Sequence, residues 1–473
     1  MALSLAGGLL GLCLAPLLTR ALARLDLDLA PRWKEIAVDG RVALATLGVA
    51  LAMGLVAGLA PVFHWRRANL RALLSDGGPG TSVGWRRNRL TSLLAVLQIA
   101  LSFVLLVSAG LLIRSFHGLM RVDPGFDPDH VVTVAIALPR EDKPAERVAF
   151  FATALERLRA LPGVQRAGFA SALPLGGSNT LFAFRIPGRP AADRDAAPFY
   201  SVTTGYLEAM KVPLRAGRYF EEKDRAGSPP ASIISQELAQ RYFGSESPIG
   251  RQLLLGAPNP TASEIVGVVG NVRDQALDFD GGPAIYGLHD QAPFRAMTLC
   301  LRTRSDPVAL LPTLRRVIRQ VDPNQPLDKA AAMNELVLDS VSDRRLALLV
   351  IGAFGAISLV LAVVGVYGLL AYTVGKAGRE IGVRMALGAE RRHIRKLVWD
   401  YAALVLAPGL LLGTLGALAA TRLLSAQLFG VSPTDPTTYA AVAVLLTTMA
   451  LLACQAPVRR AAGLDPKEAL NDE

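Results

Sequence analysis

The chain has 473 residues, of which 52% are hydrophobic and only 19% are charged. Its mean hydropathy of +0.37 is too high for a soluble protein of this length, so the composition excludes a purely soluble enzyme or binding module. The formal net charge of +11 does not indicate a nucleic-acid partner, because the basic residues are not gathered on one soluble segment. Membrane-spanning helices are therefore the first expectation.

Six apolar stretches are long enough to cross a bilayer, since a helical span takes about 20 residues. They are residues 2–18, 42–63, 90–113, 346–374, 401–424 and 437–457. The fourth contains no charged residue, which favours a membrane span over a buried helix of a soluble domain. The first could instead be a cleaved secretory signal, but no Lys or Arg precedes its apolar run, which favours a retained span. We therefore predict six transmembrane helices.

The short loops between the predicted spans are strongly basic. Six arginines lie between the second and third spans, and seven Lys and Arg residues lie between the fourth and fifth. Short basic loops remain in the cytoplasm, so both chain termini are predicted to lie inside and residues 114–345 outside. Of the three cysteines, only Cys300 lies in that outer segment, so no disulfide is predicted within it.

The outer segment has the pattern of a mixed α+β domain. Apolar residues at helical spacing predict helices at residues 145–161 and 308–321. Strands are predicted at residues 232–234, 264–269 and 297–303. The last strand alternates apolar and more polar residues, which predicts one buried and one solvent-facing side. We expect an α+β domain of βαβ-type units, with the Pro- and Gly-rich residues 188–260 as a second lobe.

The membrane part contains an internal repeat. The Gly-Leu-Leu-Gly run at residues 8–11 resembles Gly-Thr-Leu-Gly at residues 413–416, and the first two predicted spans look like a second copy of the last two. On this basis we expect four parts. They are a partial helical module with two spans (1–90), a transmembrane helix (91–113), the outer domain (114–345) and a helical domain with three spans (346–473).

Catalytic motifs are missing from the sequence. No Walker A phosphate-binding loop occurs, so any ATP-driven work would need a separate nucleotide-binding subunit. The five histidines lack metal-ligand spacing, and the Gly-x-Ser-x-Gly-like string at residues 80–84 lies in a basic loop, where a linker is the better interpretation. We predict no catalytic residue, no cofactor, no metal ion and no enzymatic activity for this chain.

Polar and small residues inside the predicted spans indicate helix packing. Gln98 is the one clear polar group deep in a span, and it could bridge to a neighbouring helix or line a path through the membrane. Glycines four residues apart, as at Gly409 and Gly413, permit close packing within the chain or across a dimer.

The loop between the fourth and fifth spans carries the candidate site. Ile381 and Met385 lie four residues apart, while Glu380 and Arg384 can pair at the same spacing on the opposite side. This pattern predicts a short amphipathic helix that ends at Gly388. Such a helix could rest on the lipid surface, with its arginines against anionic headgroups, or dock its apolar side on a cytoplasmic partner.

These motifs resemble a known family. Residues 379–389, with the sequence REIGVRMALGA, resemble the cytoplasmic loop signature of FtsX-like and MacB-like ABC permeases, and DPKEAL at residues 465–470 resembles their C-terminal tail. The outer segment is similar to the MacB-like periplasmic core domain through VPLRAGR at residues 212–218 and EIVGVVG at residues 264–270. The arrangement resembles duplicated permeases of the acidobacterial type, but begins at the third helix of their first module. That departure leaves open whether the sequence is a complete protein or an N-terminally truncated tandem permease.

The resemblance implies that residues 1–90 and 346–473 are FtsX-like permease modules and that residues 114–345 are a MacB-like periplasmic core domain. It implies a multi-pass protein of the bacterial inner membrane whose partner is a cytoplasmic ABC ATPase. A second permease module or a homodimer, membrane lipid, and a periplasmic adaptor or substrate protein are further expected partners. The residues expected to contact the ATPase are Arg379, Glu380, Ile381, Gly382, Arg384, Met385, Leu387 and Gly388.

The expected function is that of an ABC-type efflux or mechanotransmission permease, in which a separate ATPase drives movement of the outer domain. The alternative is a membrane-anchored receptor or scaffold that binds a ligand or partner outside and performs no ATP-driven transport. A receptor that signals inward would need a cytoplasmic output domain, and the short loops leave no room for one.

Overall fold

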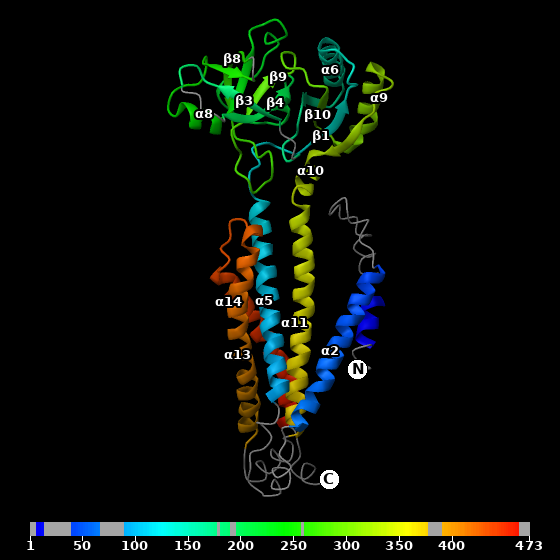
Figure 1. The fold of residues 1–473 in the computed structure, drawn as a ribbon, viewed down its shortest axis with the longest axis vertical. Helices are drawn as coiled ribbons and strands as arrows, with labels where there is room; N and C mark the ends of the chain where they lie inside the picture. The colour runs from blue at the N-terminus through cyan, green and yellow to red at the C-terminus, as the bar shows by residue number, and fades with distance from the viewer. Residues whose placement is uncertain are drawn as a thin grey trace. The chain divides into compact units, whose positions relative to one another are not determined.

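The structure is a computed structural model that describes residues 6–13, 39–66, 89–176, 180–189, 195–256, 260–376 and 390–462. The chain divides into two compact units. One comprises Met1–Gly118 and Asp343–Glu473, and the other comprises Leu119–Ser342. The described part of the first unit is helical, whereas the second unit is built on a β-sheet (Figure 1).

Long apolar helices make up the first unit. They are α2 (Gly40–Arg66), α5 (Arg89–Leu119), α11 (Ser342–Lys376), α13 (Arg391–Leu424) and α14 (Pro436–Ala462). Four of the described helices are long and apolar enough to cross a membrane, and they coincide with the third to sixth predicted spans. The second predicted span falls on α2, and the first is described only over residues 6–13, so the total of six spans stays a prediction.

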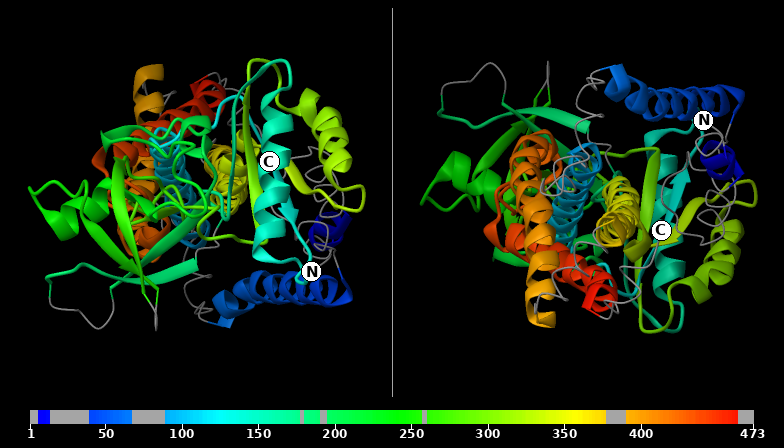
Figure 2. Two further views of the ribbon diagram at one scale, coloured as in Figure 1. Left: turned by 90° about the horizontal axis from the view of Figure 1, so that it is seen from above. Right: turned by 90° about the horizontal axis from the view of Figure 1, so that it is seen from below.

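Helix α5 forms the core of the first unit together with three other helices. Phe103 of α5 belongs to a buried apolar cluster with Ala417 of α13 and Leu446 of α14. A second buried cluster joins Ile99 of α5 to Val366 of α11. Figure 2 shows these four helices grouped together when they are seen along their length. The apolar residues of these helices are therefore partly buried in the bundle, and the helices are also long enough to cross a bilayer.

The second unit has a first lobe made of two interleaved βαβ units. Its strands are β1 (Val131–Ala137), β2 (Val164–Ala170), β10 (Ala296–Thr303) and β11 (Asp328–Ala332), in the order β11-β1-β10-β2. Strands β1 and β2 both pair antiparallel with β10, so they run parallel to each other and are linked by α6 (Pro144–Arg159). Strands β10 and β11 flank β1 in the same way and are linked by η2 (Val308–Leu310) and α9 (Leu311–Val321). This is the βαβ-type arrangement that the sequence predicts.

Strands and helices inserted between β2 and β10 form the second lobe. They are β3 (Thr180–Arg185), β4 (Ala196–Val202), α7 (Tyr206–Ala209), β5 (Leu214–Gly217), β6 (Ala231–Ser235), α8 (Gln236–Phe243), β7 (Gln252–Leu255), β8 (Thr261–Val269) and β9 (Ile285–Leu288). The second lobe predicted from composition, residues 188–260, is therefore too narrow. Strands β3 and β9 lie before and after that range in the sequence, and both pair with β4, so they belong to this lobe. A Pro- and Gly-rich composition did not indicate them, because both strands are mostly apolar.

Both faces of strand β10 are buried, which corrects the predicted solvent-facing side. Leu299 and Leu301 pack under α6 and α9, which lie side by side on one face of the first lobe (Figure 1). On the opposite face, Cys300 is 0% exposed and packs with Tyr206 of α7 and Met333 of α10 (Met333–Asp339). Burial also raises the pKa of the Cys300 thiol. The alternation of the two sides is confirmed, but α7 and α10 cover the side that the pattern assigned to solvent.

The burial of Cys300 determines how the predicted topology can be tested. We expect a membrane-impermeant maleimide to label Asp280→Cys in intact spheroplasts, because the Asp280 side chain is 97% exposed. The background carries Cys13→Ser, since Cys13 is also exposed, and Cys300 should react only after denaturation. Labelling of Asp280→Cys that requires cell lysis would place the second unit on the cytoplasmic side.

Candidate functional site

The site predicted from the sequence lies outside the described residues. Arg379, Glu380, Ile381, Gly382, Arg384, Met385, Leu387 and Gly388 all fall between the described end of α11 at Lys376 and the N-cap of α13 at Glu390. Their contact with an ATPase therefore stays a prediction. What the structure describes is how the two helices that this loop joins are connected to α5.

Polar side chains join α5 to α11 and α13. The hydroxyl of Ser102 in α5 lies 2.7 Å from the hydroxyl of Ser358 in α11, and both residues are buried. Nearer the start of α5, the hydroxyl of Ser92 lies 2.9 Å from that of Tyr401 in α13. Hydrogen bonds of this kind between membrane helices contribute about 1 kcal/mol each and hold the helices in register.

Small residues bring α11 and α13 close to α5. Gln98 lies against α11, since a Cβ added at Gly365 would lie 2.5 Å from its Oε1 atom. A Cβ added at Gly413 of α13 would lie 2.7 Å from the Cβ of Phe103. The predicted close packing at this glycine pair thus occurs within the chain, and Gln98 occupies a helix-bridging position. Helices α11 and α13 are therefore each in close contact with α5.

The connection between α13 and α14 is also fastened to α5. Asp435 precedes α14 and accepts a hydrogen bond from the backbone N–H of Thr438 at 2.9 Å, which caps the helix. The same carboxylate forms an ion pair with Arg114 of α5. The next residue of α5, Ser115, accepts a hydrogen bond through its hydroxyl from the backbone N–H of Phe429 at 2.8 Å. All three neighbours of α5 are therefore tied to it by specific contacts.

A buried arginine organises the part of the second unit where the chain enters and leaves it. Arg302 of β10 is 4% exposed and lies 3.2 Å from the carboxylate of Asp127, in the segment that follows α5. Burial raises the pKa of Asp127, but a hydrogen bond from Lys211 and the charge of Arg302 outweigh it and lower the pKa below its usual value. The carboxyl is therefore ionised at neutral pH. Sequence reasoning missed Arg302 because the alternation placed this residue on the polar face of the strand. The signal available was a charged side chain within a strand whose other residues are uncharged.

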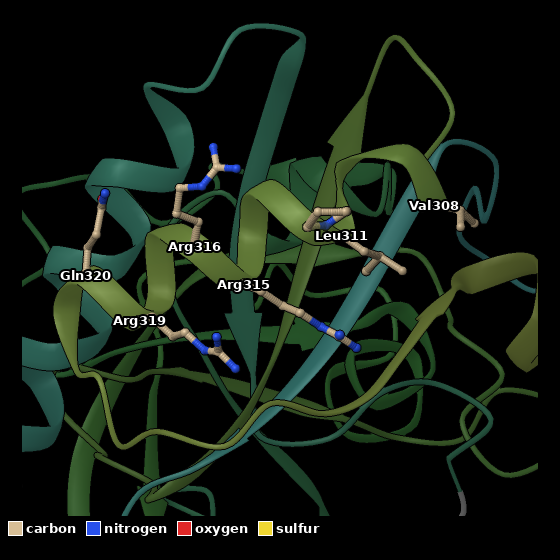
Figure 3. Close-up of a pocket in the computed structure, with 7 residues that line it drawn as sticks. Val308, Leu311, Arg315, Arg316, Arg319 and Gln320 are labelled. Atoms are coloured by element: carbon tan, nitrogen blue, oxygen red, sulfur yellow. The ribbon is translucent and has the colours of Figure 1, made fainter.

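Surface hollows lie on the described part of the second unit, and two of them have charged residues in their lining. The larger, of about 710 Å³, is lined by residues of η2 and α9, and Figure 3 shows Arg315 and Arg319 projecting from the same side of α9. The smaller, of about 430 Å³, has both acidic and basic residues in its lining, among them Arg159 and Glu208. Within the described ranges, no group of three or more His, Cys, Asp or Glu side chains is placed to hold a metal ion.

A bundle of apolar helices long enough to cross a membrane, with an inserted βαβ-type domain, is the architecture of a helical membrane protein with an extracytoplasmic domain. Residues 92–332 match the MacB-like periplasmic core domain, and residues 352–466 match the FtsX-like permease C-terminal domain. The chain belongs to the family of MacB-like and FtsX-like ABC transporter permeases.

Two curated relatives of this chain are named as export proteins that have both an ATP-binding part and a permease part. The chain is 28% identical over 280 residues to the pyoverdine export ATP-binding/permease protein PvdT of Pseudomonas syringae pv. tomato, covering 57% of this chain and 42% of that protein. It is 26% identical over 275 residues to the macrolide export ATP-binding/permease protein MacB of Marinobacter nauticus, covering 56% of this chain and 42% of the relative. The chain thus spans about two fifths of the length of these relatives.

Two solved structures that are similar to part of this chain are named as a periplasmic region and an extracellular domain. The periplasmic region of MacB from Actinobacillus actinomycetemcomitans covers 46% of this chain and 95% of its own length, at 12% identity and a TM-score of 0.33. The extracellular domain of the ABC-type transporter YknZ covers 42% of this chain and all of its own, at 16% identity and a TM-score of 0.29.

Proposed function

We propose that this chain is the permease subunit of an ABC-type efflux or mechanotransmission system, in which a separate cytoplasmic ATPase moves the extracytoplasmic domain. The family places it among transporter components, and the relatives' names pair a permease with an ATP-binding part. The supporting observation is the set of contacts that ties α11 and α13 to α5, as at Ser102 and Ser358. Helices α5 and α11 are the two that continue directly into the second unit, so movement at their cytoplasmic ends would reach it.

The proposed location, topology and partners rest on the sequence patterns. We place the chain in the bacterial inner membrane with six spans, both termini inside and the second unit in the periplasm. A second permease module or a second copy of the chain completes the transporter, and a periplasmic adaptor or substrate protein contacts the outer domain. The relatives are named for pyoverdine and macrolide export. For this chain the proposed work is export of a substrate, or force applied to one, outside the membrane.

Replacement of Ile381 and Met385 by aspartate is expected to abolish association with the ATPase while the chain still inserts into the membrane. An unpaired charge buried in a protein groove costs several kcal/mol, which is more than a short docking helix can offset. The measurement is the amount of Walker A ATPase that co-purifies with the tagged chain. The matched control is the double variant Ile381→Leu and Met385→Leu, which keeps the apolar side and should retain the ATPase.

Two other results would change the proposal. Co-purification of the aspartate variant at the wild-type ratio would assign the loop to the lipid surface. A wild-type chain that purifies with no nucleotide-binding subunit would favour the receptor or scaffold.

A further inference from the structure

The second unit is joined to the membrane helices through two segments. One is residues 120–130, which lead from α5 to β1, and the other is α10, which is separated from α11 only by Ser340 and Val341. These segments continue into neighbouring strands, because β1 and β11 pair antiparallel with Val132 opposite Ala332. The entry and the exit of the chain therefore lie next to each other in the fold.

The entering segment has a fixed shape. Gly125 adopts a φ of 82°, and a Cβ at this position would lie 2.0 Å from the carbonyl oxygen of Asn271, so only glycine fits. Its N–H donates a 2.8 Å hydrogen bond to the carboxylate of Asp123. The carbonyl of Pro124 accepts a 3.0 Å hydrogen bond from the N–H of Arg273. The segment is thus held against the second lobe before it reaches β1.

Arg302 holds the same segment against the centre of the first lobe. Its guanidinium donates hydrogen bonds to the backbone carbonyls of Asp127 at 2.6 Å and of Asp129 at 2.7 Å. A third bond, to the carbonyl of Ala209 at 2.7 Å, attaches the end of α7. Since β10 lies between β1 and β2, one buried side chain connects the entering segment to an inner strand of the first lobe.

The leaving segment is attached to the entering one directly. The side-chain amide of Asn334 in α10 donates a 2.9 Å hydrogen bond to the carboxylate of Asp129. The hydroxyl of Thr133 in β1 donates a 3.0 Å bond to the carbonyl of Ala331, just before α10. Asp129 therefore meets Arg302 through its backbone and α10 through its side chain.

We infer that Asp129, Arg302 and Asn334 form a clamp that makes the two segments move as one body, so that α5 and α11 act on the outer domain together. The inference rests on the proposed function. Without the clamp, the two segments would be joined only where β1 pairs with β11, and the ends nearer the membrane helices could shift relative to each other. Asp129 and Asn334 are positioning residues, and both are exposed, so they can be changed without opening the core.

The side-chain pair allows an exchange experiment in the full chain. Asn334→Asp sets two carboxylates against each other and should open the clamp, whereas Asp129→Asn combined with Asn334→Asp restores an amide-to-carboxylate bond in the opposite direction. Spin labels at Arg121→Cys and Leu338→Cys report the distance between the two segments. We expect a narrow distance distribution in the wild type and in the double variant, and a broadened one in the single variant. Equal widths in all three chains would overturn the clamp.

A second measurement tests whether ATP hydrolysis by the partner subunit changes the distance between the membrane helices and the second unit. In the complex with the co-purified ATPase, labels at Leu423→Cys and Asp280→Cys should show an ATP-dependent change in distance. The complex that carries Asn334→Asp should still hydrolyse ATP through its ATPase subunit but lose that distance change, and the complex with the double variant should regain it. A single variant that responds to ATP like the wild type would overturn the inference. A wild-type complex with no ATP-dependent change would instead overturn the proposed function, and the distance widths would then decide the clamp alone.

Discussion

Replacement of Arg302 by methionine is expected to lower the free energy of unfolding of the second unit by about 3 to 5 kcal/mol. Methionine keeps the apolar stem but removes every donor. The backbone carbonyls of Ala209, Asp127 and Asp129 would then lose their hydrogen bonds to the guanidinium. The Asp127 carboxylate, whose side chain is 31% exposed, would also lose its buried counter-charge. The loss is large because partly buried acceptors without partners carry their full desolvation cost.

The buried thiol of Cys300 provides the measurement. It lies two residues before Arg302 on the same strand and is 0% exposed, so it reacts only when the unit opens. In a chain whose other two cysteines are replaced, Arg302→Met should speed labelling of Cys300 roughly 100-fold or more, because each 1.4 kcal/mol is tenfold.

A surface arginine supplies the control for this measurement. Arg251 pairs with Glu246 at 3.6 Å, and both side chains are more than half exposed, so Arg251→Met should change the labelling rate little. If Arg302→Met labelled no faster than this control, Arg302 would not hold the segments together.

Acidification from pH 7 to pH 4 is expected to remove about 3 kcal/mol of stability from the second unit through His289 alone. The ring is 1% exposed and packs edge to face on Phe151 at 5.2 Å. Burial and the nearby charge of Arg147 lower the pKa of His289 to about 4. An unfolded histidine has a pKa of about 6.5, so between these two values the unfolded state binds more protons. Stability is therefore complete above about pH 6.5 and falls as the pH drops towards 4.

The pH profile of His289→Asn isolates this contribution. Asparagine can still accept the hydrogen bond that Nδ1 receives from the N–H of Phe294, but it does not titrate. Neighbouring Asp290, whose pKa is raised by burial, works in the opposite direction and remains in both chains. Amide hydrogen exchange of the second unit, corrected for intrinsic rates, should show a flatter profile in the variant. His130→Asn, at an exposed turn, is the matched control, and equal slopes in His289→Asn and wild type would refute the assignment.

Local properties of the sequence determined most of the elements. A span needs only length and an apolar composition, so four helices appear where the sequence predicts them. The helix predicted at residues 145–161 appears as Pro144–Arg159, because its apolar spacing and the following Pro162-Gly163 act within a few residues. The family could also be predicted from the sequence, because its motifs are short and contiguous, and the family matches confirm it. The loop at residues 379–389 lies outside the described residues, so its contact with an ATPase stays a prediction from its own pattern.

Only the tertiary structure decided which residues meet. Arg302 and Asp127 are 175 positions apart, and no local pattern says that the strand bearing Arg302 closes against the segment after α5. One side of β10, the side that carries Cys300, was expected to face solvent, because alternation shows that a strand has two faces. Burial depends on which other segments cover each face. The partners of Gly413 and Gln98 were likewise set by the packing of α5. Hydrogen bonds and burial are properties of pairs of segments, and sequence periodicity describes one segment at a time.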